Sequence, residues 1–213
     1  MKLQISYDFI DIVDALSVAK LTADYADIME IGASLLYAHG IQAIKAFRDQ
    51  FPDKELFADT KIIDKITRTI PLFASSGANS LSILAGADNK AIAQAVSQAR
   101  TNNLKVMIDL IDSSSPGQSA LDAQGFEVDA IIFRRPTEIE NSIDLIDAWQ
   151  NVRGNTSLPI FIGGNITLEN LPEIVELEPH GIIVGSDITR AENPQEQAQK
   201  IRDFILSKRK NSE

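Results

Sequence analysis

Two kinds of segment alternate along the chain. Short apolar runs rich in β-branched residues, which are typical of buried strands, are each followed by a longer stretch in which apolar residues recur with helical spacing. The runs predict strands over Leu3–Tyr7, Ile28–Ile31, Leu56–Asp59, Ser80–Leu84, Val106–Asp109, Ala130–Phe133, Ile160–Ile162 and Gly181–Val184. Because these runs are uniformly apolar and do not alternate with polar residues, we expect a parallel sheet with both faces covered.

The stretches between the runs predict helices. Their ranges are Ile12–Ala23, Gln42–Gln50, Ile66–Ser75, Lys90–Thr101, Ser119–Ala123, Ile143–Val152, Leu171–Leu177 and Pro194–Ser207. In "NKAIAQAVSQARTNN" the apolar residues fall on one helix face, with polar residues opposite. Gly77 follows the third predicted helix and suits its C-terminal cap.

Eight strand–helix pairs in 213 residues predict an α/β fold of one kind, a single (β/α)8 TIM barrel. We expect one domain over residues 1–213, with 208–213 as a polar tail. The alternative is a doubly wound open sheet, which usually has fewer strands and a glycine-rich first turn. The first turn here reads "YDFID" and contains no glycine, so the pattern favours the barrel.

Charged residues stand where the predicted strands end. The acids at these ends are Asp8, Glu30, Asp59 and Asp109. The stretch "ADTKIID" adds Lys61 and Asp64. Strand ends of a barrel meet at one mouth, where barrel enzymes hold their chemistry. Such a cluster cannot all ionise without compensation, which Lys61 and a divalent cation such as Mg²⁺ could supply, since hard oxygen ligands suit that ion.

A single acid at a strand end is more often a helix N-cap or a solvated loop residue. That interpretation suits Asp11 and Asp88, and it stays open for Asp8. Capping does not explain why charged residues recur at Glu30, Asp59, Lys61, Asp64 and Asp109. We therefore interpret this second set as functional.

Glycines mark the ends of the last two predicted strands. The seventh ends in "FIGGNIT", with Gly163 and Gly164, and the eighth in "IVGSDIT", with Gly185 and Ser186. Glycine lets backbone N–H groups approach a ligand closely, and barrels often bind phosphate after strands seven and eight. The glycines could also serve only as tight turns, but the pair favours a phosphate site and hence a small phosphorylated substrate.

Composition excludes several classes of function. The chain has no cysteine, so it has neither a disulfide nor a thiolate site, and its two histidines disfavour a His-rich metal site. A formal net charge of −10 disfavours nucleic acid as a partner. No apolar run reaches the ~20 residues that span a membrane, and "MKLQISYDF" lacks a signal-peptide pattern. We expect a cytoplasmic protein.

Several motifs resemble one enzyme superfamily. "ADTKIID" matches the D-x-K-x-x-D signature of the orotidine 5′-monophosphate decarboxylase superfamily. In "DIMEIG", Glu30 stands where orotidylate decarboxylases carry lysine, which resembles the 3-hexulose-6-phosphate synthase and 3-keto-L-gulonate-6-phosphate decarboxylase branch. "FPDKELFADTK", "VMIDLID" and "GGNIT" are also similar, and "VGSDIT" favours the synthase. The resemblance runs from Met1 to about Ile205.

This resemblance implies a ribulose-phosphate-binding barrel and a Mg²⁺-dependent lyase that acts through a 1,2-enediolate. Glu30 and Asp59 would bind the metal, and Lys61 would lie beside the enediolate. Asp64 would arrive from the other subunit of a homodimer. Asp8 and Asp109 would orient neighbours and substrate hydroxyls, and the glycine turns would hold the phosphate of a sugar phosphate.

The chain also departs from the family pattern. Arg134 stands where the family carries a histidine, and the glycine-containing loop after it is shortened. Neither His39 nor His180 aligns with that histidine. Lys65 follows Asp64 where small residues are usual. Arginine stays charged, so Arg134 could hold an anion or an enediolate oxygen but is a poor general acid.

Three functions remain open. The first is a synthase-like aldol addition of formaldehyde to D-ribulose 5-phosphate. The second is a 3-keto-L-gulonate-6-phosphate decarboxylase or another ketose-phosphate lyase. The third is a non-catalytic sugar-phosphate-binding paralogue, which Arg134 and the short sixth loop motivate.

Overall fold

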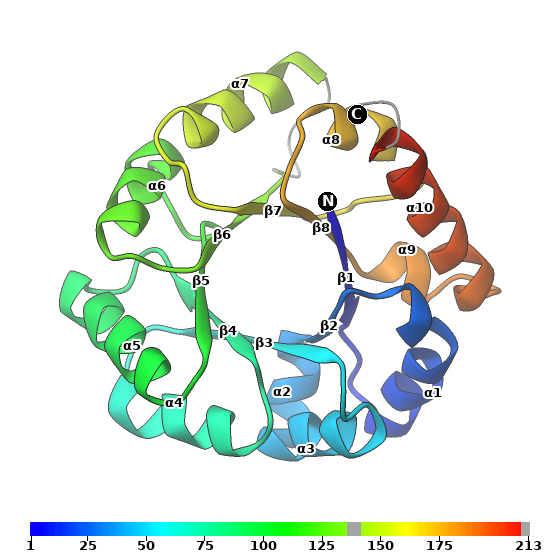
Figure 1. The fold of residues 1–213 in the computed structure, drawn as a ribbon, viewed down its shortest axis with the longest axis horizontal. Coiled ribbons are helices and arrows are strands. Elements are labelled where there is room, and N and C mark those ends of the chain that lie inside the picture. The colour runs from blue at the N-terminus through cyan, green and yellow to red at the C-terminus, as the bar shows by residue number, and fades with distance from the viewer. Residues whose placement is uncertain (136–141, 210–213) are drawn as a thin grey trace.

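The apolar runs form parallel strands that close into one barrel in sequence order (Figure 1), as predicted. The computed structural model describes residues 1–135 and 142–209. Its strands are β1 Lys2–Tyr7, β2 Ile28–Ile31, β3 Glu55–Ile62, β4 Ser80–Leu84, β5 Lys105–Asp109, β6 Ala130–Arg134, β7 Ile160–Gly163 and β8 Gly181–Val184. β8 pairs with β1 and closes the barrel. The shortened loop expected after Arg134 falls largely outside the described residues.

Helices surround the barrel on its outer face (Figure 1). They are α1 Ile12–Thr22, the 3-10 turn η1 Ala23–Tyr25, α2 Ala33–His39, α3 Ile41–Gln50, α4 Ile66–Ser75, α5 Asn89–Thr101, α6 Pro116–Gly125, α7 Ser142–Arg153, α8 Leu171–Glu176, α9 Ser186–Thr189 and α10 Pro194–Arg209. The sequence pattern missed the short helices α2 and α9. Across the described residues, no helix combines the length and the apolar character needed to cross a membrane.

The core has two parts because neighbouring strand residues point to opposite faces. One set of strand residues packs outward against the helices, in a cluster that includes Leu3, Ile31 and Leu81. The other set points inward and fills the barrel. Its apolar members are Ile28, Phe57, Met107, Ala130, Ile132, Phe161 and Ile183.

Polar residues occupy further inward positions, above this apolar layer. Those buried on the first five strands include Gln4, Ser6, Glu30, Ser82 and Asp109. The expectation of uniformly apolar strands was therefore wrong near the strand ends, where inward residues are polar and outward residues stay apolar. Ser6 lies opposite Glu30 in the β1–β2 register, so small polar side chains meet carboxylates across the sheet.

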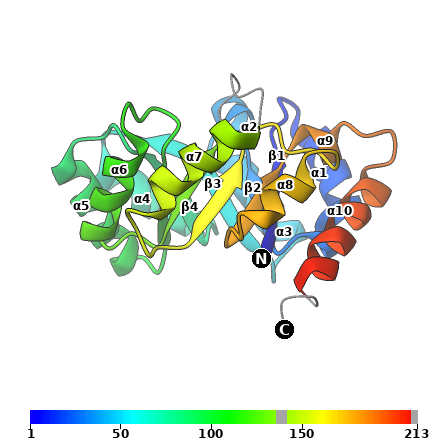
Figure 2. The same ribbon diagram turned by 90° about the horizontal axis from the view of Figure 1, so that it is seen from above.

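Asp27 ties the last helix to the start of the sheet. Its carboxylate accepts a hydrogen bond from the Leu3 N–H at 2.8 Å and from both terminal nitrogens of Arg202 on α10, of which Nη2 lies at 3.0 Å. The N-terminus and the end of α10 lie on the side of the barrel where the strands begin (Figure 2). This contact stabilises the barrel on the side away from the mouth.

Asp27→Asn should lower the free energy of unfolding at neutral pH by about 1–3 kcal/mol, because Arg202 loses its charged partner. Burial would raise the pKa of Asp27, but hydrogen bonds from Arg202 and from Leu3 bring that pKa below its usual value. The stability that Asp27 adds is therefore present above about pH 4 and is lost as the pH falls through the lowered pKa.

Urea unfolding of both proteins at neutral and at acidic pH measures this effect, with the exposed Asp24→Asn as control. The difference between wild type and Asp27→Asn should shrink at acidic pH. A difference that is the same at both pH values would contradict this role of the Asp27 carboxylate.

Candidate active site

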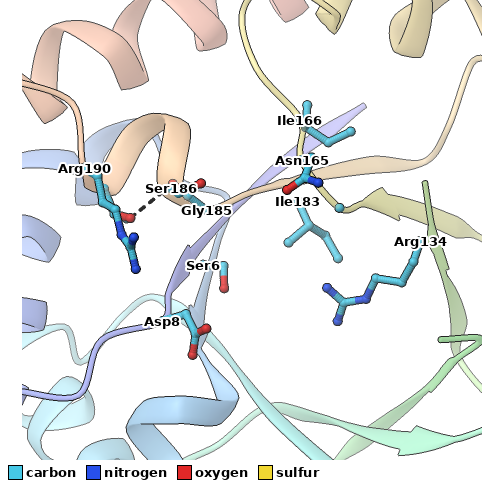
Figure 3. Close-up of a pocket in the computed structure, with 11 residues that line it drawn as sticks. Ser6, Asp8, Arg134, Asn165, Ile166, Ile183, Gly185, Ser186 and Arg190 are labelled. Carbon is cyan, nitrogen blue, oxygen red and sulfur yellow. Dashed lines mark hydrogen bonds between the residues drawn. The ribbon is translucent and has the colours of Figure 1, made fainter. Parts of the chain in front are cut away.

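A cavity of about 310 Å³ opens at the mouth where the strands end. Figure 3 shows the side chains that surround it. Ser6 and Asp8 come from β1 and the loop after it, Arg134 from the end of β6, and Gly164 and Ser186 from the turns after β7 and β8. The topology thus brings both halves of the sequence-predicted site, the charged and the glycine-rich, to one place.

Four charged side chains at the mouth form what we call the charge ring: Lys61, Asp59, Arg134 and Asp109. Lys61 Nζ donates to Asp59 Oδ2 and lies 3.8 Å from Asp109 Oδ2. Arg134 Nη2 donates to Asp109 Oδ2 at 2.7 Å and lies 3.7 Å from Asp59 Oδ2. Positive and negative groups therefore alternate, and two cations balance two carboxylates.

Burial makes this balance necessary. Asp109 is 0% exposed and Asp59 is 4% exposed, and an unpaired charge at either position would be strongly destabilising. Arg134 also donates from Nε to both oxygens of Asp109, at 3.2 and 3.3 Å. Burial would lower the pKa of Arg134, but Asp109 and the other carboxylates raise it above its ordinary value, so the guanidinium is a permanent cation.

The backbone at the end of β3 aims Asp59 and Lys61 at the same place. The β3–β4 register shifts between Ala58 and Ile62, and Lys61 has a positive φ of 46°. Ser82 on β4 secures this irregular segment, because its hydroxyl donates to Asp59 Oδ1 and accepts from the Lys61 N–H, both at 2.9 Å. Asp59 and Lys61 were predicted to point the same way, and they do.

Glu30 adds a third buried carboxylate beside the charge ring. It is 2% exposed and accepts hydrogen bonds from Gln4 Nε2 at 2.5 Å and from Ser6 Oγ at 2.7 Å. Burial, together with the nearby charge of Asp59, raises the pKa of Glu30 to about 7. A positive charge near Glu30 would favour its ionised form.

Asp8 both caps a helix and lines the cavity. Its Oδ1 accepts a hydrogen bond from the Ser34 N–H, at 2.8 Å, in the first turn of α2. Gly32 permits this close approach, since a Cβ there would lie 2.6 Å from the Cα of Asp8. The capping alternative left open for Asp8 is therefore correct, and its place in the cavity leaves a role in substrate orientation as a prediction.

Asp64 does not join the charge ring within one chain. Its side chain is 71% exposed, and its partner is the adjacent Lys65, whose N–H donates to Oδ1 at 2.6 Å and whose Nζ lies 3.1 Å from Oδ2. A single chain therefore leaves Asp64 at the surface. Its predicted role across a subunit interface stays a prediction.

The turns after β7 and β8 form the opposite side of the cavity. Gly164 has a positive φ of 93°, and a Cβ there would lie 3.1 Å from the Arg135 carbonyl oxygen. Gly163 ends β7 behind the cavity, and a Cβ there would lie 3.7 Å from Arg134 Nη1. Gly185 and Ser186 line the cavity at the start of α9. All four residues lie where a phosphate site was predicted.

Sequence reasoning missed several polar residues of this site. Arg190 lies at the end of α9 and lines the cavity beside Ser186, as Figure 3 shows. Its signal was a positive charge that closely follows "VGSDIT". Gln4, Ser6 and Ser82 were missed because small polar residues within apolar runs were not interpreted as inward-facing.

Neither of the two histidines of the chain lines the cavity, which extends the family departure at Arg134 to the whole mouth. His180 precedes β8 and packs against Phe161, with ring centroids 5.8 Å apart. His39 ends α2, and its Nε2 lies 2.9 Å from the Ile10 carbonyl oxygen. Neither can replace the proton-transferring histidine that the resemblance implies.

Glu30 and Asp59, the predicted Mg²⁺ ligands, fit a divalent cation poorly. All four of their carboxylate oxygens already accept hydrogen bonds, and Lys61 and Arg134 place two positive charges against Asp59. Over residues 1–135 and 142–209, no three His, Cys, Asp or Glu side chains are grouped so that they could hold a metal ion. Mg²⁺ binding stays a prediction.

A barrel with paired carboxylates and a lysine on one side of its mouth and glycine turns on the other belongs among the (β/α)8 barrels that bind ligands at their strand ends. The chain belongs to the orotidine 5′-phosphate decarboxylase / HUMPS family, whose family model matches residues 1–201.

Curated and solved relatives cover nearly the whole chain. A 3-hexulose-6-phosphate synthase of Bacillus subtilis (strain 168) is 29% identical over 210 residues, which are 97% of this chain and 99% of the relative. The structure of 3-hexulose-6-phosphate synthase from Salmonella typhimurium superposes with a TM-score of 0.89 and 27% identity, covering 97% of this chain and 99% of that one.

A third relative shares the fold at lower identity. The structure of KGPDC from Streptococcus mutans, solved in complex with a small phosphorylated sugar, has a TM-score of 0.88 and 20% identity, and the match covers 97% of both chains.

Ser82→Ala should lower the free energy of unfolding by about 1–3 kcal/mol, because buried Asp59 Oδ1 loses a hydrogen-bond donor and the Lys61 N–H loses an acceptor. Chemical denaturation measures the effect. Ser80→Ala, two residues earlier on the same strand and also buried, is the matched control. Equal destabilisation by both changes would contradict a specific role for Ser82.

Proposed function

We propose that this protein is a lyase of phosphorylated ketoses and that it catalyses the 3-hexulose-6-phosphate synthase reaction, the aldol addition of formaldehyde to D-ribulose 5-phosphate. The observation that carries this proposal is the arrangement of one cavity between two cationic regions. The charge ring lies on one side, and the turns after β7 and β8 lie on the other with Arg190. Similarity to the Bacillus subtilis synthase over 97% of the chain supports it.

The two regions divide the work on such a substrate. Gly164, Gly185 and Ser186 line the cavity where a phosphate would accept backbone hydrogen bonds, and Arg190 would add a positive charge. The ketose carbonyl would then lie toward the charge ring. Lys61 and Arg134 would stabilise the negative charge that develops on its oxygen, because fixed cations in a buried site act strongly on developing charge.

The chemistry requires a balanced proton transfer. A proton leaves C1 of the ketose, C1 forms a bond to the formaldehyde carbon, and the formaldehyde oxygen gains a proton. Arg134 does not give up its proton, whereas a lysine amine can transfer one. Lys61 is therefore the side chain of the charge ring that we assign to proton transfer, with Arg134 assigned to charge stabilisation.

A second function is favoured by one observation. Since Arg134 replaces an acid–base histidine and neither histidine of the chain lines the cavity, the chain could bind sugar phosphates without turning them over. Decarboxylation of 3-keto-L-gulonate 6-phosphate is the other lyase reaction to test. Substrate trials separate these functions.

The first assay follows formaldehyde consumption with D-ribulose 5-phosphate, with and without Mg²⁺. Turnover is expected for the wild type, and Lys61→Ala should lower it at least about 100-fold, since general acid–base groups contribute on this scale. Arg134→His tests the family histidine. A silent wild type together with an active Arg134→His variant would reject the synthase reaction for this chain, and binding without turnover by either would favour the second function.

We also propose a homodimer in which Asp64 completes the site of the partner. Large apolar side chains are exposed on loops of the mouth side, including Ile10 at 72%, Val13 at 66% and Ile63 at 56%. Ile63 is adjacent to Asp64. A second copy of the chain that covered these residues would bury apolar surface and would bring Asp64 toward a neighbouring mouth.

Mixing two inactive variants tests this shared site. In a dimer with Lys61→Ala on one chain and Asp64→Ala on the other, one of the two sites has both native residues. Equal mixing with subunit exchange should recover roughly a quarter of wild-type turnover, because half of the dimers are mixed and each holds one native site. No recovery, with mixed dimers shown by mass spectrometry, would contradict the shared site.

A further inference from the structure

The acidic mouth contains a positive charge that interacts with all three of its buried carboxylates. Arg134 donates to Asp109 from Nη2 and Nε and lies 3.7 Å from Asp59 through Nη2. It is also close enough to Glu30 for its charge to favour the ionised carboxylate. One guanidinium thus lies among the groups that the family resemblance would assign to a divalent metal and its surroundings.

We propose that Arg134 is the resident cation of this site and replaces the divalent metal, so that an enediolate is stabilised without bound Mg²⁺. The catalytic part of this inference rests on the function proposed above. The part that concerns metal affinity rests on the charge ring alone.

Charge balance supports this replacement. Lys61 and Arg134 together neutralise Asp59 and Asp109, which leaves Glu30 as the third carboxylate, held by the neutral donors Gln4 and Ser6. A metal ion on Asp59 would meet Lys61 in direct contact with the same carboxylate and Arg134 close by. Repulsion at these short distances is strong inside a protein. Mg²⁺ also requires near-ideal octahedral oxygen ligands and loses its water reluctantly.

The shape of the guanidinium supports it as well. Figure 3 shows Arg134 extending from β6 into the cavity, in the direction of Ser6. Its bonds to Asp109 fix the plane of the group. A planar fork of N–H donors matches paired oxygens. The two oxygens of a cis-enediolate are such a pair, so the group can stabilise the same charge that a metal would chelate.

Direct metal binding tests the proposal without relying on catalysis. Mn²⁺ stands in for Mg²⁺, and electron paramagnetic resonance follows the free ion during titration. Arg134→Gln should bind Mn²⁺ at least roughly tenfold more tightly than the wild type, on the scale by which neighbouring groups alter metal affinity. Arg134→Lys, which keeps the charge, should bind as weakly as the wild type. Arg135→Gln removes the adjacent positive charge and should also match the wild type.

Two results would overturn the proposal: a wild type that binds Mn²⁺ as tightly as Arg134→Gln, or an Arg134→Lys variant that binds like Arg134→Gln. Arg134→Gln leaves Asp109 without its guanidinium, so thermal unfolding is measured first. If that variant does not fold, the double variant Asp109→Asn/Arg134→Gln takes its place, because it removes both charges of the pair.

The catalytic arm compares wild-type turnover after EDTA treatment with turnover in excess Mg²⁺. Equal rates are expected, and turnover that is lost with EDTA and restored by Mg²⁺ would overturn the proposal. A wild type that turns over no ketose phosphate under either condition would reject the proposed function, and the Mn²⁺ titration would still decide whether Arg134 excludes the metal.

Discussion

The closed barrel buries three carboxylates within a few side chains of one another, and their charge has to be balanced inside the protein. Glu30, Asp59 and Asp109 are each at most 4% exposed, so water can solvate little of their charge. Breaking a buried ion pair from one side typically costs about 3–5 kcal/mol. Lys61 and Arg134 are therefore structural requirements of this mouth as well as its chemical groups.

The barrel makes this concentration of charge possible because it separates two tasks along the same strands. Inward residues in the lower part of the barrel, such as Phe57 and Phe161, are apolar and fill it. Inward residues nearer the strand ends are polar and meet residues from neighbouring strands. Outward residues stay apolar throughout and hold the helices. The charged mouth thus lies on a packed apolar layer that fixes its position.

The strand positions could be predicted from the sequence because each depends on a local run of apolar residues. The residues at the strand ends could be predicted too, since parallel strands of a barrel end at one rim. Partnerships could not, because Arg134 on β6 finds Asp109 on β5 and Asp59 on β3 only through the register of the closed sheet. The short helix α2 and the place of Arg190 were missed for a similar reason: both depend on how loops pack at the mouth. Asp64 shows a further limit, because one chain does not contain the surroundings that its predicted role requires.

Arginine at position 134 changes the kind of control that this mouth can exert. A histidine there would exchange protons near neutral pH, and the net charge of the mouth would change with it. Arg134 keeps one charge, and Asp109 holds it in one orientation. The charge ring is therefore neutral and rigid whether or not substrate is present, and it favours oxygen anions that match its fork. Proton transfer must then come from a group that can release a proton, and within the charge ring Lys61 is the side chain with that chemistry. The same substitution that removes an acid–base group from the mouth thus gives it a fixed cation, and the two consequences cannot be separated.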